Sequence, residues 1–189
     1  VDLVREVLPW SRLDGIRVRY GDARETLGRL PDALLGACDL VVVDVFAGAR
    51  IPAHVTSVEF YREVARLLAP EGVVLVNVAD GPPLRFARAQ AVTLAAALGV
   101  DPGAPPARAG AGRRLTADHE EATVAALAET QVLKGRRFGN VVLAGSRAGI
   151  PLDWLPRLLA AGPHPAKAVV GVELASWTAG AAVTTDADA

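Results

Sequence analysis

Cysteine is nearly absent from this chain of 189 residues, because Cys38 is the only one. A single thiol cannot close an internal disulfide, which is typical of a protein kept in a reducing compartment. No apolar run approaches the length of a membrane span, and the opening residues lack the layout of a signal peptide. These absences predict a cytoplasmic protein that does not act in a membrane.

Several motifs that carry chemistry are also missing. The sequence has no G-x-S-x-G, which leaves a hydrolase of that type without support. His54, His119 and His164 lie far apart and have no partner at helical or C-x-x-C spacing, so no metal site is expected. Gly110–Gly112 lacks the third glycine of a phosphate-binding loop and follows a proline-rich stretch instead of a strand. The net charge of -1 gives no support to nucleic-acid binding.

What the chain does contain is enough apolar sequence for one folded domain. Hydrophobic residues make up 51% of it and charged residues 22%, which is typical of globular proteins. A chain of this length can bury a substantial core. We therefore expect a single domain over residues 1–189.

Residues 38–61 organise the rest of the sequence. The uninterrupted apolar run Leu40–Val43 is typical of a strand that is buried on both faces of a parallel sheet. Asp44 follows directly, where ligands of open α/β sheets bind. Thr56–Glu59 then matches a helix capping box, and apolar residues recur after it at helical spacing. Asp44 is a candidate catalytic carboxylate, although a turn residue or a helix cap explains this Asp equally well.

Strands and helices alternate along the chain. Apolar periodicity predicts strands at 16–20, 40–43 and 73–78, and helices at 1–8, 23–30, 57–68, 84–98, 152–160 and 171–178. Residues 122–133 and 138–144 predict two further strands, joined as a hairpin by residues 134–137. This order indicates an α/β protein with a Rossmann-like, doubly wound, mostly parallel sheet that closes with a C-terminal antiparallel hairpin.

Two segments lack such periodicity. Residues 101–114, DPGAPPARAGAGRR, are rich in Pro, Gly and Arg and predict a mobile insertion loop. The tail from Ala179 onward is expected to be frayed.

Two more side chains are candidates for a site near Asp44. Asp22, in Gly21-Asp22-Ala23, follows the predicted strand at 16–20 and could accept a hydrogen bond from a ligand amine. A helix N-cap explains Asp22 better when it is considered alone, because the residues after it are helical in pattern. His54 lies in the loop after Asp44, where a solvated histidine is favoured over a catalytic one.

Taken together, these segments resemble the spermidine synthase family, which comprises aminopropyltransferases built on the methyltransferase-like Rossmann fold. Gly21–Ala23 is similar to the family's G-D-A, and Asp39–Asp44 is similar to its D-x-I-I-x-D. Glu59–Tyr61 matches the E-F-Y that opens the next helix, at the family's spacing. The resemblance covers residues 1–100 well, and residues 134–146 fit the closing hairpin more weakly.

The resemblance implies a role for individual residues. Asp44 matches the family's catalytic base, which also anchors the amine. Asp22 matches the residue that binds the adenine amino group, with Ala23 beside it in the cofactor-binding motif. Tyr61 either lines the substrate pocket, where it would face a cation, or packs in the core.

The sequence departs from the family pattern in two ways that affect the expected function. The family carries a second acidic residue three positions after the base, where this chain has Ala47, so ordinary putrescine recognition is in question. The Gly-rich loop, the ribose-binding acid and the N-terminal domain of the family are absent, which predicts an N-terminally truncated member. Such a chain is expected to bind a nucleoside weakly on its own.

The chemistry implied is transfer of an aminopropyl group from decarboxylated S-adenosylmethionine to a polyamine-type amine, with no metal. A methyltransferase that uses S-adenosylmethionine is the alternative on the same fold, and a non-catalytic remnant or interaction domain is a third. The expected partner is a small-molecule amine, and a homodimer is left open.

Overall fold

The structure is a computed structural model that describes residue 7 and residues 15–48, 50–106, 121–162 and 164–188. These residues form a five-stranded sheet in the order β1-β2-β4-β3-β5. The strands are β1(Cys38–Val43), β2(Leu68–Asp80), β3(Glu121–Glu129), β4(Gly139–Pro151) and β5(Ala166–Val170). The α-helices are α2(Ala23–Leu27), α3(Val58–Leu67), α4(Arg85–Leu98), α5(Thr130–Leu133), α6(Leu155–Ala160) and α7(Gly171–Trp177). Short 3₁₀ turns are η2(Asp32–Leu34), η3(Ala53–Val55) and η4(Leu152–Trp154).

The sheet confirms the α/β fold class and shows how its strands pair. β1 and β2 are parallel, whereas β2–β4, β3–β4 and β3–β5 are antiparallel. The sheet is therefore mixed, and among the described strands the expected parallel pairing is confined to β1 and β2. That pair is connected through α3, as in a β-α-β unit.

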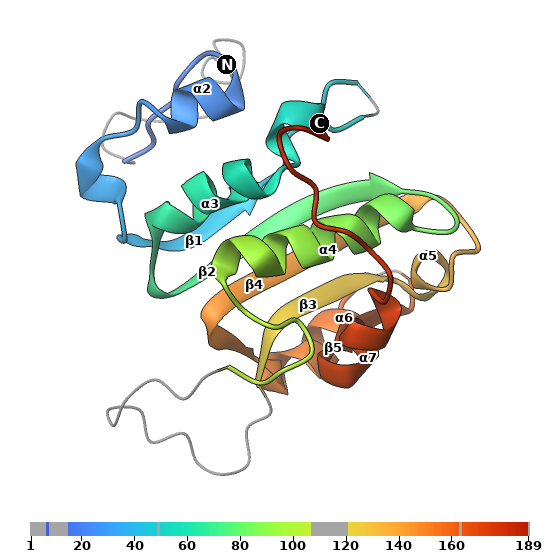
Figure 1. Cartoon of the computed structure of the whole chain (residues 1–189). Helices are drawn as coiled ribbons and strands as arrows, with labels where there is room; N and C mark the ends of the chain where they lie inside the picture. The colour runs from blue at the N-terminus through green and yellow to red at the C-terminus, as the bar shows by residue number, and fades with distance from the viewer. Residues whose placement is uncertain (1–6, 8–14, 49, 107–120, 163, 189) are drawn as a thin grey trace.

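One face of the sheet carries the main core, which α3 and α4 cover (Figure 1). Val74, Val76 and Val78 alternate along β2 and are buried on this face. α4 approaches β4 closely, because a Cβ added at Gly145 would lie 2.6 Å from a Leu98 methyl carbon. Buried and half-buried residues therefore alternate along β2, because α3 and α4 pack against one face of the sheet.

The opposite face is open at β1, which corrects the expectation that this strand is buried on both faces. Val43 is buried in the core, but residues Leu40 and Val42 are 56% and 58% exposed. The reason is that α3 and α4 pack on one face, and β1 pairs only with β2 among the described strands.

The strand predicted at residues 16–20 is wrong. The segment has no strand structure, and both Ile16 and Tyr20 are exposed. Alternating sequence forms a strand only when it finds a pairing partner, and this segment has none among the described residues. The helix predicted after it is present as α2, although it is shorter than expected.

The predicted C-terminal hairpin is confirmed as the antiparallel pair β3–β4, with Ala128 opposite Val141. Its connection is longer than expected, because residues 130–133 form α5 instead of continuing the strand. β5 was not predicted; it adds to the outer edge of β3, with Ala126 opposite Val169. The helices predicted at 152–160 and 171–178 are present.

The expectation that the tail is frayed is also wrong. The backbone N–H of Val58 donates to the Thr184 carbonyl at 2.8 Å, and the N–H of Thr184 donates to Thr93 Oγ1 at 2.9 Å. Figure 1 shows the tail leaving α7 and crossing the outer side of α4 toward the start of α3. The tail is held because α3 and α4 satisfy its backbone hydrogen bonds, which composition does not reveal.

The predicted mobile loop is only partly described. Residues 101–106 form a turn, in which Thr123 Oγ1 donates to the Asp101 carbonyl at 2.8 Å. Residues 107–114 lie outside the described residues, as does the helix predicted at 1–8 apart from Val7.

Candidate active site

Asp44 and Asn77 lie side by side at the carboxyl end of the paired part of β1 and β2. Val43 of β1 is in register with Val76 of β2, so the next residue of each strand reaches the same edge. Asn77 Nδ2 donates to Asp44 Oδ1 at 2.9 Å. Asp44 is exposed to solvent, and its second carboxylate oxygen has no hydrogen-bond partner among the described residues. An exposed carboxylate, oriented by one amide and open on its other oxygen, can accept a proton or bind a cation.

Asn77 is a site residue that sequence reasoning missed. Its Oδ1 is buried and has no partner among the described residues, which is costly unless a donor arrives from outside the chain. The available signal was a single amide in the otherwise apolar run Val73–Val78. A polar residue at the end of a buried strand is a stronger pointer to a site than an apolar one.

Asp22 is held as the N-cap of α2. Its Oδ1 accepts from the backbone N–H groups of Arg24 at 2.9 Å and Glu25 at 3.1 Å. Its Oδ2 lies 2.7 Å from His54 Nε2. The Glu25 hydrogen bond, followed by the bond to His54, lowers the pKa of Asp22 below its ordinary value. The geometry is that of the N-cap alternative, with His54 as an added partner; Ala23 is the first residue of the helix.

His54 is exposed in the loop after Asp44, as expected, and it also pairs with the carboxylate of Asp22. It lies on η3, in the connection between β1 and α3, and meets the carboxylate of Asp22 across 32 residues of sequence. Both side chains remain partly exposed. The pair shows that the connection after Asp44 and the start of α2 are adjacent in the fold.

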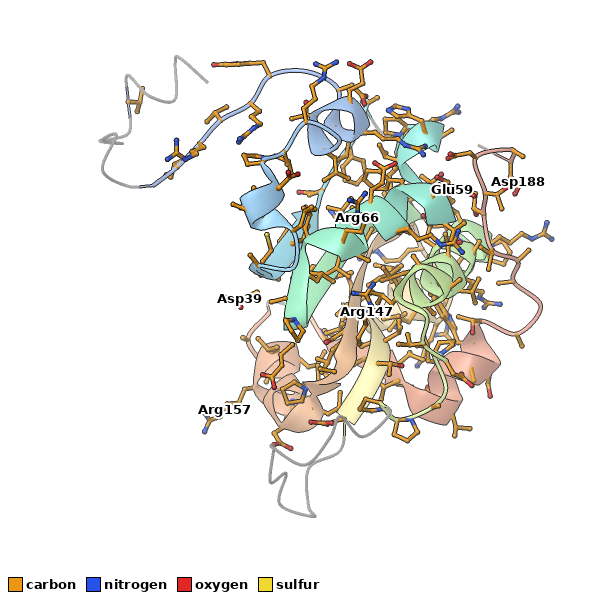
Figure 2. All side chains as sticks on the ribbon, turned by 60° about the vertical axis from the view of Figure 1, so that its left-hand side comes forward. Asp39, Glu59, Arg66, Arg147, Arg157 and Asp188 are labelled. Atoms are coloured by element: carbon orange, nitrogen blue, oxygen red, sulfur yellow. The ribbon has the colours of Figure 1, made fainter. Side chains whose placement is uncertain are left out.

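The C-terminal tail joins the same region through Arg24. Its guanidinium makes two hydrogen bonds to the Asp186 carboxylate, at 2.7 and 2.8 Å, and a third to the His54 carbonyl at 2.9 Å. The N–H of Asp186 donates to Glu59 Oε2 at 2.9 Å. In Figure 2, Glu59 at the start of α3 and Asp188 on the tail lie on the same side of the molecule. Sequence reasoning missed this network, because the tail carries no periodic signal.

Tyr61 lies inside the core, where its geometry favours packing over a pocket-lining role. It is 2% exposed, and its hydroxyl donates to Gln90 Oε1 at 2.7 Å. Gln90 in turn donates to the Thr56 carbonyl at 3.1 Å. Burial raises the pKa of the Tyr61 hydroxyl. The residue thus links α3 to α4 from the inside.

Two further positions at this edge have structural partners. Ala47, at the place of the family's second acid, is bridged to Arg50 by a backbone hydrogen bond of 2.8 Å in a turn that contains Gly48 at φ +64°. Asp80, at the end of β2, accepts from the N–H groups of Gly81 at 2.7 Å and Ala87 at 2.9 Å. Asp80 is therefore occupied in holding the loop before α4 and the first turn of that helix.

Within the described part of the chain, no group of three or more His, Cys, Asp or Glu residues is placed to hold a metal ion. Likewise, none of the helices described is long and apolar enough to cross a membrane.

No protein-family model and no curated protein sequence matches this chain. Among solved structures, the chain is similar to a probable spermidine synthase from Corynebacterium glutamicum ATCC 13032, with a TM-score of 0.76 and 27% sequence identity. The chain has a spermidine synthase-like fold. The match covers 98% of this chain and 59% of that chain, so this chain spans less than two thirds of the neighbour's length. The α/β, methyltransferase-like fold class predicted from the sequence is thereby confirmed.

Proposed function

We propose that this chain carries the amine-binding side of an aminopropyltransferase active site, with Asp44 as the base. The observation that supports this most is the pair Asp44–Asn77 at the carboxyl end of the paired part of β1 and β2, in a fold similar to that of a probable spermidine synthase. Ligands of open α/β sheets bind at this end of the strands. The whole protein's reaction is part of the proposal, because the chain spans 59% of that neighbour.

The proposed step is a displacement at the carbon beside the sulfonium of decarboxylated S-adenosylmethionine. Asp44 takes a proton from the substrate ammonium, and the freed nitrogen lone pair attacks that carbon. The carbon–sulfur bond breaks, and its electron pair neutralises the sulfonium to a thioether. Proton transfer to a positioned side chain contributes roughly 10²–10⁴ in rate. The negative charge of Asp44 also attracts the ammonium before reaction.

On the donor side, we assign Asp22 to the adenine amino group and Ala23 to the turn that approaches the nucleoside. Each oxygen of Asp22 accepts from the protein already, through the start of α2 and through His54. A carboxylate has about four lone-pair positions, so an added amine donor is compatible with these contacts.

On the acceptor side, Ala47 supplies no second carboxylate. An acceptor bound here is held by one charge at Asp44, which the Asn77 amide orients. Ala47 also supports the alternative function, a methyltransferase that uses S-adenosylmethionine, since methyl transfer does not require a second anionic anchor.

The test offers both donors to the chain, each at millimolar concentration with putrescine or spermidine, and identifies products by mass spectrometry. We expect aminopropyl transfer, reduced roughly 10²–10⁴-fold in Asp44→Asn. An asparagine keeps an oxygen for the Asn77 amide, so the variant removes the charge while preserving the contact. Asp39→Asn is the matched control, because Asp39 is exposed at the opposite end of β1.

Unchanged aminopropyl transfer in Asp44→Asn would contradict the assignment of the base. Methyl transfer from S-adenosylmethionine, without aminopropyl transfer, would favour the alternative. A parallel titration of the chain with spermidine, followed by NMR, tests the amine site without any donor. The backbone amide signals of positions 44 and 77 should shift in the native chain and in Asp39→Asn, and should not shift in Asp44→Asn.

A further inference from the structure

A cavity of about 480 Å³ lies between α4 and the C-terminal tail, and Asp44 is not among the residues that line it. One wall is formed by Arg85, Arg88 and Ala89 at the start of α4, and the other by residues 179–184 together with Asp188. Figure 1 shows the tail crossing α4 at this place. The volume of the cavity falls within the range of about 300–1,000 Å³ that small-molecule sites occupy.

The guanidinium group of Arg88 is held in this wall by Trp177, but among the described residues no carboxylate pairs with its charge. Its guanidinium carbon lies 5.6 Å from the centroid of the Trp177 ring, a stacking contact that holds the group in place. The Arg88 Nε atom is buried and has no hydrogen-bond acceptor among the described residues. A buried charged donor left without an acceptor is costly, so this position favours an acceptor supplied from outside the chain.

Arg85 adds a second positive charge to the same wall. It precedes Arg88 by three residues on α4, so both side chains project from one face of the helix. Neither arginine forms an ion pair with a carboxylate among the described residues.

Among the described residues that line the cavity, Asp188 is the only acid. It is occupied by Thr185, whose N–H and hydroxyl both donate to Asp188 Oδ2, at 3.0 and 2.7 Å. These bonds lower the pKa of Asp188. The described lining therefore has more positive than negative side chains, and the carboxylate of Asp188 already accepts two hydrogen bonds from Thr185.

We propose that this cavity binds a small ligand through an oxyanion, a phosphate or carboxylate group, held by Arg85 and Arg88. The planar guanidinium fork matches the geometry of both groups, and charge-assisted hydrogen bonds are the strong ones. This ligand is distinct from the reactants proposed at Asp44, because an amine and a sulfonium are cations. A ligand here touches α4 and the tail together, so its binding also stabilises the tail against α4.

The experiment titrates the intact chain with inorganic phosphate, adenosine monophosphate and citrate at constant ionic strength, by calorimetry. The three probes separate free phosphate, a nucleotide phosphate and a carboxylate as the source of the oxyanion. We expect saturable binding of at least one probe, weakened at least about tenfold in Arg88→Gln and in Arg85→Gln, the loss expected for one charge-assisted hydrogen bond. The matched control is Arg157→Gln, which removes an exposed arginine on α6 that points away from the body of the molecule (Figure 2) and should bind as the native chain does.

A second readout distinguishes a site from general attraction to a basic surface. The bound probe should raise the melting temperature of the native chain and slow hydrogen exchange of the tail amides, and neither effect should occur in Arg88→Gln. Arg85 is exposed, so Arg85→Gln is expected to fold and keeps the test decisive if Arg88→Gln does not. The proposal is overturned if no probe binds saturably at millimolar concentration, or if Arg157→Gln weakens binding as much as the two cavity variants do.

Discussion

At the scale of single residues, the candidate site depends on an amide that has only one of its polar atoms satisfied. Asn77 Nδ2 is bonded to Asp44, and its Oδ1 is buried without a partner among the described residues. A core position that served packing alone would favour an apolar side chain there. The amide at this position therefore indicates a role toward Asp44, to which it donates.

We predict that Asn77→Leu separates stability from binding. Leucine has a similar volume and removes the unsatisfied oxygen, so the free energy of unfolding should hold or rise by about 1 kcal/mol. Spermidine binding should weaken, because Asp44 loses the donor that orients it. Urea unfolding and NMR titration measure the two quantities. A loss of stability with unchanged amine binding would make Asn77 a packing residue.

Gly145 decides how closely α4 approaches the sheet. An added Cβ would meet side-chain carbons of Leu98 at 2.6 Å and Leu94 at 3.2 Å. We predict that Gly145→Ala destabilises the chain by about 1–3 kcal/mol through overpacking. Gly28→Ala is the control, since its φ is -65° and its nearest neighbours lie at 3.8 Å or more. Equal midpoints in urea for Gly145→Ala and the native chain would show that α4 can shift without cost.

At the scale of elements, the tail is held at two kinds of contact. The backbone of Thr184 accepts from the Val58 N–H and donates to the Thr93 hydroxyl, and the paired hydrogen bonds of Arg24 hold Asp186. The contact brings α2, the start of α3 and the tail together. The tail is thereby part of the folded domain and covers the outer side of α4.

We predict that Arg24→Gln releases the tail while leaving the sheet intact. The Val58 amide, which donates to Thr184, should then exchange faster with solvent. Arg29→Gln is the control, because Arg29 pairs on the surface with Glu25 and does not touch the tail. Hydrogen-exchange mass spectrometry of the peptide around Val58 measures the difference, and equal exchange in both variants would show that the backbone bonds alone hold the tail.

The same release is expected from acid without any mutation. The hydrogen bonds from Arg24 lower the pKa of Asp186 from 3.8 to about 2. Because the carboxyl pKa is lowered in the folded chain, the stabilisation by the Arg24–Asp186 contact is complete above pH 3.8 and is lost as the pH falls toward 2. Exchange at Val58 in the native chain should therefore approach that of Arg24→Gln over this interval.

At the scale of the whole molecule, β1 leaves one edge and part of one face of the sheet without cover among the described residues. Leu40 and Val42 are exposed on β1, and β1 is also an unpaired edge strand among the described residues. Exposed apolar side chains beside an unpaired strand edge favour association between copies of the chain. The chain also spans 59% of the solved structure it resembles.

We predict concentration-dependent self-association, reduced in the double variant Leu40→Thr and Val42→Thr. Threonine keeps strand propensity and lowers the apolar area. Val172→Thr is the control, because Val172 is 79% exposed on α7. α7 contacts β3 and β5, which lie at the end of the sheet opposite to β1. Sedimentation velocity at increasing concentration measures the effect. A native chain that stays monomeric at every concentration would contradict the prediction.

Local pattern was enough to predict much of the fold from the sequence. The apolar runs Leu40–Val43 and Val73–Val78 predicted β1 and the body of β2, and helical spacing predicted α3 and α4. Asp44 was placed at a strand end by the same means. These features could be read because each depends on residues close together in the chain, where periodicity reports which face is buried.

The remaining features depend on which segments meet in space. Residues 16–20 alternate like a strand but have no pairing partner, while β5 and the tail lack a strong pattern and are fixed by β3, α3 and α4. The contacts Asp44–Asn77, Asp22–His54 and Arg24–Asp186 join residues 33, 32 and 162 positions apart. Sequence by itself determined which segments could form strands and helices, whereas tertiary packing decided which polar groups became partners, because a hydrogen bond depends on distance in space and not on separation along the chain.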